Sequence, residues 1–241
     1  MFKTVLINSQ DRAQGTESAF RVDFENKDLV INRYKVRSIV IPKTYPNVNA
    51  YNKTFVLNYN SVDYTITLTE GIYTIITDLT GEMVSKMNTA VGGTPLSASY
   101  SSITGKITFT SSASNFYFKF ASLGEIAHLI GFEETNGTPG ATQSSSKRVN
   151  LEYSPVIYLH INELKPEGLS SSNAVGSYQK AILSIRYLYG QSIAEDFLED
   201  DMLQCNYHYK AINALNIRLV DYKNRTINMD ETNWSVELEI E

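Results

Sequence analysis

The chain has 241 residues, 42 % hydrophobic and 20 % charged, so it is long enough to bury a core of ordinary composition. Its 21 basic and 26 acidic residues give a net charge of −5, which argues against a protein that wraps nucleic acid. Cys205 is the single cysteine, so an internal disulfide is excluded. No segment approaches the ~18 apolar residues of a membrane span, and we expect no span.

The first part of the chain has the alternating pattern of β-strands. Lys3 to Asn8 is predicted as a short strand. The segment Ala19 to Glu25 places Phe20, Val22 and Phe24 on one face and charged residues on the other. A period of two with one apolar face is typical of a strand that covers a core and faces water on its other side.

The stretch DLVINRYKVRSIVIPKTYPN, from Asp28 to Asn47, is the most informative in the sequence. It is a long, β-branched strand that ends at Pro42 and enters a turn with a second proline, Pro46. Because Tyr34 to Pro42 is more continuously apolar than the preceding strands, we expect a central strand there.

A hairpin and a helix are predicted next. Thr54 to Tyr59 and Tyr64 to Leu68 flank Asn60-Ser61, a dipeptide that favours a tight β-turn. Tyr73 to Val91 carries apolar residues one helical turn apart, which predicts an amphipathic helix. These residues are Ile76, Leu79, Met83, Met87 and Val91. Gly92-Gly93 and then Pro95 should end the helix.

After the helix, Lys106 to Thr110 and Phe116 to Phe120 are predicted to pair as a second hairpin. Glu125 to Ile130 is predicted as a short helix closed by Gly131. Thr135 to Ser146 is small and polar and predicts an exposed loop tolerant of change.

The last third of the chain is predicted to be strands separated by loops. The expected strands are Val156–Leu164, Tyr178–Tyr189, Leu203–Tyr209, Asn216–Asp221 and Ser235–Ile240. Lys165 to Ser177 is predicted as an exposed Ser/Gly-rich loop, and Gly190 to Asp201 as an acidic connection. The expected fold is therefore an all-β antiparallel sandwich of jelly-roll type. We expect one domain, residues 1–241, with an α/β insertion at about 60–132.

No residue pattern indicates catalysis. Of the three histidines, His128, His160 and His208, the second lies in the apolar strand YLHIN. We interpret it as a strand histidine rather than a catalytic base. Cys205 and His208 form a C-x-x-H pair, but no second pair supplies the other ligands of a structural zinc.

Acidic residues are densest in one segment, which we interpret as a solvated loop face because it lacks the spacing of a calcium loop. These residues are Glu195, Asp196, Glu199, Asp200 and Asp201. Phosphate-binding glycine loops, nucleophile elbows and metalloprotease motifs do not occur in the sequence. We therefore expect no enzyme, and no catalytic, cofactor-binding or metal-binding residue.

Several motifs, taken in order, resemble a known family. They are INSQDR (Ile7–Arg12), VRSIVIPKTYPNVNAYN (Val36–Asn52), GIYT (Gly71–Thr74), SITGKITFT (Ser102–Thr110), LIGF (Leu129–Phe132), NIRLVDYKNRTI (Asn216–Ile227) and a final strand with Trp234. In this order the chain resembles the penton, or minor capsid, proteins of virophages, polinton-like viruses and related large DNA viruses.

The resemblance implies a single jelly-roll protein that forms homopentamers at the five-fold vertices of an icosahedral capsid. The implied partners are other copies of the chain and the major capsid protein of the virion, with assembly inside the host cell. The 16 tyrosines fit both a half-buried sheet and a subunit interface.

Two other functions remain open. A fibre-like or lectin-like jelly-roll module would recognise a host receptor or glycan through exposed loops, and a sandwich-fold enzyme would act on a polysaccharide. The first should show exposed aromatic rings in a groove, and the second should show two convergent carboxylates.

Overall fold

The computed structural model describes residues 3–24, 29–31, 33–121, 125–152, 157–164, 182–183, 193–196, 203–204 and 211–241. Contacts between residues divide the chain into two compact units. Unit 1 comprises Met1–Tyr45 and Ser154–Glu241, and unit 2 comprises Pro46–Tyr153. Unit 2 contains the whole predicted block 60–132 and extends beyond it at both ends.

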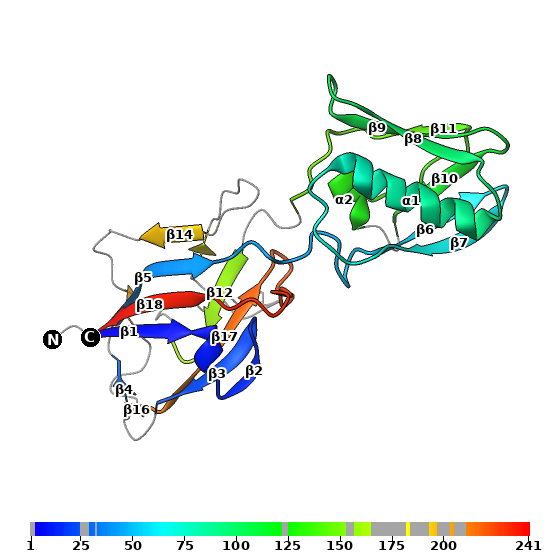
Figure 1. Cartoon of the computed structure of the whole chain (residues 1–241). Coiled ribbons are helices and arrows are strands. Elements are labelled where there is room, and N and C mark those ends of the chain that lie inside the picture. The colour runs from blue at the N-terminus through cyan, green and yellow to red at the C-terminus, as the bar shows by residue number, and fades with distance from the viewer. Residues whose placement is uncertain are drawn as a thin grey trace, which may run out of the picture. The chain divides into compact units, whose positions relative to one another are not determined.

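Unit 1 contains two five-stranded antiparallel sheets (Figure 1). In the first, the order is β1 (Lys3–Asn8), β18 (Ser235–Ile240), β5 (Arg33–Ile41) and β14 (Ile193–Asp196), and β15 (Leu203–Gln204) also pairs with β5. In the second, the order is β13 (Ile182–Leu183), β12 (Ile157–Ile161), β17 (Ala214–Val220), β3 (Ala19–Asp23) and β2 (Gln14–Thr16). A short pair, β4 (Leu29–Val30) and β16 (Ala211–Ile212), lies beside them.

The strand order is that of a jelly roll. The first strand of the chain, β1, lies beside the last, β18, and the strands between them alternate between the two sheets. The eight main strands follow one another in the order β1, β3, β5, β12, β13, β14, β17 and β18. The connection from β12 to β13 stays within one sheet, and each of the other connections crosses from one sheet to the other. This is the double Greek key of a jelly roll. With 44 % of residues in strands and 13 % in helices, the predicted fold class is confirmed.

The core of unit 1 is built from the faces that alternation predicts. The alternating patterns of β3, β5, β17 and β18 predict ten inward-facing residues, and seven of them are buried: Phe20, Ile39, Ile41, Ile217, Leu219, Val236 and Leu238. The other three, Val22, Phe24 and Val36, are half-buried and pack against this core. They lie near strand ends or beside the β-bulge at Glu237/Leu238, where a strand turns its face away from the core.

The start of the chain is joined to its end around Trp234. The indole is 2 % exposed, its Nε1 donates a hydrogen bond of 2.6 Å to the Glu17 carbonyl, and its ring packs edge-on against Phe20. The Ser9 hydroxyl accepts a hydrogen bond of 3.0 Å from the Trp234 backbone N–H. The INSQDR motif and the terminal strand therefore lie together in the fold.

Unit 2 contains two three-stranded antiparallel sheets. One has the order β10 (Phe116–Lys119), β6 (Thr54–Tyr59), β7 (Val62–Thr67), and the other β11 (Thr142–Ser144), β9 (Lys106–Ser111), β8 (Leu96–Ser101). Asn136 and Gly140 form backbone bridges with β10, and the chain then continues into β11. Residues 136–144 therefore connect one sheet to the other. Helix α1 (Ile76–Val91) packs against β7 and β8, and α2 (Ile126–Ile130) completes the unit.

The predicted helix and first hairpin are confirmed. In α1, Ile76, Leu79, Met83 and Met87 are buried, and the helix ends at Gly92, whose φ of 76° is left-handed. The β6–β7 turn has positive φ at both Asn60 and Ser61, as a type I′ turn requires.

The second hairpin was predicted with the wrong partner. Strands β9 and β10 do not pair: β9 lies between β8 and β11, and β10 pairs with β6. Strand β8, LSASYS, was missed because its small polar residues carry no apolar alternation. Strand β8 forms because it pairs with β9, although its own sequence does not favour a strand.

Two polar segments also contain strands that we predicted as loops. Thr135 to Ser146 is largely exposed but includes β11, and Gly190 to Asp201 includes β14, which pairs with β5. Edge strands need only backbone hydrogen bonds on one side, so a polar sequence suffices. Lys165 to Ser177 lies outside the described residues, as do most of the predicted strands Tyr178–Tyr189 and Leu203–Tyr209.

The stability of helix α1 can be tested at Gly81, an exposed residue in the middle of the helix. A methyl group added at this position would meet no atom within 4 Å. We expect Gly81→Ala to stabilise the protein by about 0.5–1 kcal/mol, because alanine restricts the unfolded chain and favours helix. Thermal unfolding measures the effect. The matched control is Gly92→Ala, which should destabilise because its φ of +76° is unfavourable for alanine.

Candidate functional site

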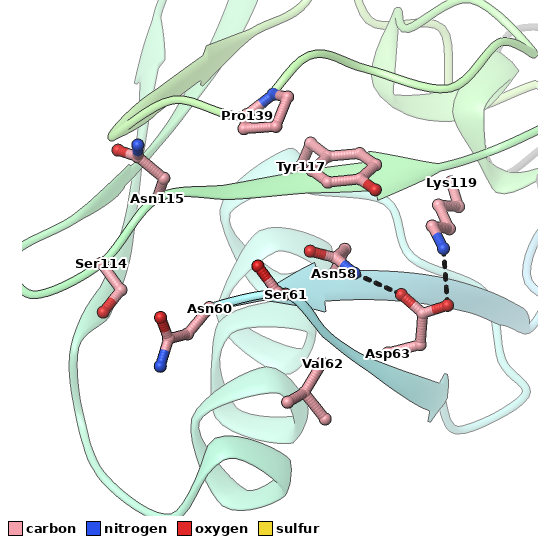
Figure 2. Close-up of a pocket in the computed structure, with 10 residues that line it drawn as sticks. All are labelled: Asn58, Asn60, Ser61, Val62, Asp63, Ser114, Asn115, Tyr117, Lys119 and Pro139. Atoms are coloured by element: carbon pink, nitrogen blue, oxygen red, sulfur yellow. Dashed lines mark hydrogen bonds and ion pairs between the residues drawn. The ribbon is translucent and has the colours of Figure 1, made fainter.

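A polar hollow of about 850 Å³ lies on unit 2 (Figure 2). Strands β6, β7 and β10, the turn between β6 and β7, and the segments before β10 and before β11 form it. Its lining residues are Asn58, Asn60, Ser61, Val62, Asp63, Ser114, Asn115, Tyr117, Lys119 and Pro139.

Strand alternation places the side chains of Asn58, Asp63 and Tyr117 on the outer face of the β10-β6-β7 sheet. Phe55, Leu57, Phe116 and Phe118 are buried on the inner face of the β10-β6-β7 sheet, so the residues between them face outward. Antiparallel pairing then sets Tyr117 and Asp63 on either side of Asn58. One row across the sheet thus brings together side chains from three strands.

An ion pair organises one end of the hollow. Lys119 Nζ lies 2.5 Å from Asp63 Oδ2, and the Asn58 amide donates to Asp63 Oδ1. The hydrogen bonds from Lys119 and Asn58 hold the pKa of the Asp63 carboxyl below its ordinary value, and the bond to Asp63 raises the pKa of the Lys119 ammonium. Both charges are partly exposed, so the pair adds little stability and mainly fixes geometry.

Backbone and amide hydrogen bonds hold the other end. The Asn60 backbone N–H donates to the Asn115 carbonyl at 3.1 Å, which ties the turn to the segment before β10. The Gln143 amide donates to the carbonyls of Phe116 and Thr138, each at 2.9 Å, and so fixes the segment that carries Pro139.

The described residues that line the hollow include few groups that take part in catalysis. Asp63 is the one carboxylate among them, and glycoside hydrolysis requires two. Neither histidine nor cysteine is among them. In the part of the chain that the structure describes, no three His, Cys, Asp or Glu side chains gather to hold a metal ion.

The candidate histidines and acidic residues that the structure describes lie on three different elements, α2, β12 and β14. His128 is exposed on α2, where its Nε2 lies 2.8 Å from a Glu134 carboxylate oxygen. Glu195 and Asp196 lie in β14, a strand rather than the predicted loop. Cys205, His208, Glu199, Asp200 and Asp201 lie outside the described residues.

His160 lies on β12 and is 4 % exposed, as expected of a strand histidine. Arg218, its partner across to β17, donates from Nη2 to the ring Nδ1 at 3.4 Å. Burial, and secondarily the positive charge of Arg218, lowers the pKa of His160 to about 4. The imidazole is therefore neutral in the folded protein at neutral pH.

This low pKa predicts a pH dependence of stability. The unfolded chain takes up a proton at His160 near pH 6.5, whereas the folded chain does so near pH 4, so stability should be lost as pH falls through that window. The contribution is at most about 1.4 kcal/mol per pH unit. Comparing urea unfolding of the wild type and His160→Gln measures it. His128→Gln is the control, and a wild-type-to-His160→Gln difference that stays constant across the window would contradict the assignment.

Two of the motifs behind the family resemblance, Val36–Asn52 and Gly71–Thr74, meet in unit 2 through the side chain of Asn47. The Asn47 side chain is 5 % exposed; it donates to the carbonyls of Tyr73 and Leu151 at 2.9 and 2.8 Å and accepts from the Tyr73 N–H at 2.8 Å. Asn52 in turn donates to the Asn47 carbonyl at 2.7 Å. Asn47 therefore joins the first residues of unit 2 to the GIYT motif and to its last residues.

We expect Asn47→Ala to destabilise unit 2 by about 2–4 kcal/mol, because three partly buried backbone groups lose their partner. Amide hydrogen exchange across residues 46–152 measures the loss. Asn88→Ala is a comparison in the same unit, since Asn88 is only half-buried and bonds a single residue, Leu96. An equal or smaller effect at Asn47 would contradict its joining role.

The sequence did not reveal the hollow. Asn60-Ser61 was recognised as a turn, but Asp63 and Lys119 are separated by 56 positions and meet only because β6 lies between β7 and β10. No local motif marks such a pair.

Helices in the described part of the chain are too short or too polar to cross a membrane. No protein-family model matches the sequence, and no curated protein matches it.

Similar solved structures exist. The crystal structure of the mavirus penton protein matches with a TM-score of 0.52 at 14 % identity, covering 100 % of this chain and 99 % of that chain. A chain of the cryo-EM structure of the Sputnik virophage matches with a TM-score of 0.45 at 14 % identity, covering 100 % and 97 %. The chain thus shares the fold of the mavirus penton protein, and the resemblance expected from its sequence motifs is confirmed at the level of the fold.

Proposed function

We propose that the chain is a structural capsid protein that forms homopentamers and closes the five-fold vertices of an icosahedral shell. The observation that carries this proposal is the whole-chain likeness to the mavirus penton protein, which extends through both units. In this proposal the chain is one jelly-roll domain, and unit 2 is an insertion between β5 and β12.

The physical properties of the chain are compatible with this role. A cyclic ring needs heterologous contacts between copies, in which two different surfaces of one subunit meet its two neighbours. Two stacked sheets with exposed edges and loops offer such surfaces without a catalytic group. The proposed partners are other copies of the chain and the major capsid protein, and the proposed location is the virion, after assembly inside the host cell.

A reconstruction of purified particles tests the proposal. We expect density for the jelly roll and for unit 2 at every five-fold vertex. The control is a particle assembled from the major capsid protein without this chain, which should have open vertices that fill when the purified chain is added. Pentamers held by small interfaces dissociate in dilute solution, so the particle is the sample to examine.

Finding the chain in a tail or fibre, or not finding it in particles, would refute the vertex role. The receptor-binding module would then become the leading function. A polysaccharide-acting enzyme is disfavoured at the hollow, because Asp63 has no second carboxylate beside it.

A further inference from the structure

We propose that the polar hollow on unit 2 binds a neutral carbohydrate. This assigns to the chain a ligand site in addition to the capsid role, and it is independent of that role. The residues that would contact the sugar are Asn58, Asn60, Asp63, Asn115, Tyr117 and Pro139.

The charge of the hollow selects against an ionic ligand. Asp63 and Lys119 are the two charged residues among those that line it, and they neutralise each other at 2.5 Å. Among the described lining residues, no cation is left over to attract a phosphate, sulfate or carboxylate, and no anion is left over for a cation. A neutral ligand that offers many hydrogen bonds fits this balance.

The hydrogen-bonding groups of the hollow match sugar hydroxyls. Within the described residues, the exposed side-chain amides of Asn60 and Asn115 make no hydrogen bond to the protein, and both lie at the end of the hollow away from the Asp63–Lys119 pair (Figure 2). Each side-chain amide offers two N–H donors and a carbonyl acceptor, and a sugar hydroxyl can likewise both donate and accept a hydrogen bond. At the other end, the oxygens of Asp63 are held in place by Asn58 and Lys119 and retain lone pairs for further donors.

An apolar surface completes the site. The Tyr117 ring is half-buried and is flanked by Pro139 (Figure 2). The Lys119 ammonium lies 5.9 Å from the ring centroid, which favours a fixed ring orientation. The C–H face of a pyranose can pack on such a ring while its hydroxyls reach the amides, so the hollow combines the apolar platform and convergent polar groups of a ligand site.

The test is binding of the full-length protein to an array of neutral, sialylated and sulfated oligosaccharides, followed by titration calorimetry with the best neutral glycan. We expect binding to neutral glycans, and about a tenfold loss of affinity in Tyr117→Ala, which removes the platform. Asn60→Gly should weaken binding by several fold, since glycine keeps the positive φ of the turn while the amide is removed.

Tyr100→Ala is the matched control, because Tyr100 is 40 % exposed on β8 of the same unit and does not line the hollow. Its affinity should equal that of the wild type. The proposal is overturned if no neutral glycan binds at about 10 mM, if only anionic glycans bind, or if Asn60→Gly and Tyr117→Ala both bind as the wild type does. Thermal unfolding of each variant separates lost binding from lost folding, and Asn60→Gly decides if Tyr117→Ala is unfolded.

Discussion

Phe118→Ala is expected to destabilise unit 2 by about 3–5 kcal/mol, the range for removing a buried phenylalanine. Phe118 is 1 % exposed on β10 and lies at the centre of a cluster of phenylalanine rings. The ring centroids within 6 Å of it belong to Phe55, Phe109, Phe116, Phe120 and Phe132. Its removal leaves a cavity that rings from both sheets of unit 2 cannot fill without moving.

Urea unfolding followed by circular dichroism measures this loss, and hydrogen exchange locates it in β6, β9 and β10. Phe118→Leu is the matched control: it retains most of the buried volume and should cost clearly less than alanine. If Phe118→Ala lowered stability by under about 1 kcal/mol, the ring cluster would not be the core of unit 2.

Trp234→Ala should have an effect of similar size in unit 1, about 3–5 kcal/mol. The indole packs against Phe20 at 5.6 Å between ring centroids and donates to the Glu17 carbonyl, so the substitution removes buried area and leaves an unpaired carbonyl. Trp234 lies where the end of β1, the β2–β3 hairpin and the start of β18 meet.

Denaturant unfolding followed by circular dichroism is the appropriate measurement, because Trp234 is the single tryptophan and fluorescence is lost with it. Trp234→Phe separates the two contributions: it keeps an aromatic ring and loses the hydrogen bond, and should cost about 1 kcal/mol for that bond in addition to a smaller packing loss. Equal stability of the wild type and Trp234→Ala would show that the two ends of the chain are not joined here.

Only part of the candidate site can be predicted from the sequence. The pattern of β6 and β10 indicates that Asn58 and Tyr117 face away from the apolar side of a strand, because alternation is local. The pattern does not indicate that the two side chains lie in one row across the sheet. That depends on the register of β10 against β6 and of β6 against β7, which pairs Tyr117 with Asn58 and Asn58 with Asp63.

Elements whose side chains repeat regularly can be predicted from the amino-acid sequence. The apolar faces of β3, β5, β17 and β18, the helix α1 and the Asn60-Ser61 turn follow from local periodicity and backbone preference. Which strands pair becomes clear only from the folded structure. Strand β8 and the acidic strand β14 lack apolar alternation and form because β9 and β5 offer them free backbone hydrogen-bonding groups, and β10 pairs with β6 because both bury phenylalanines in one core. Pairing depends on contacts between residues distant in the chain, and no local pattern encodes them.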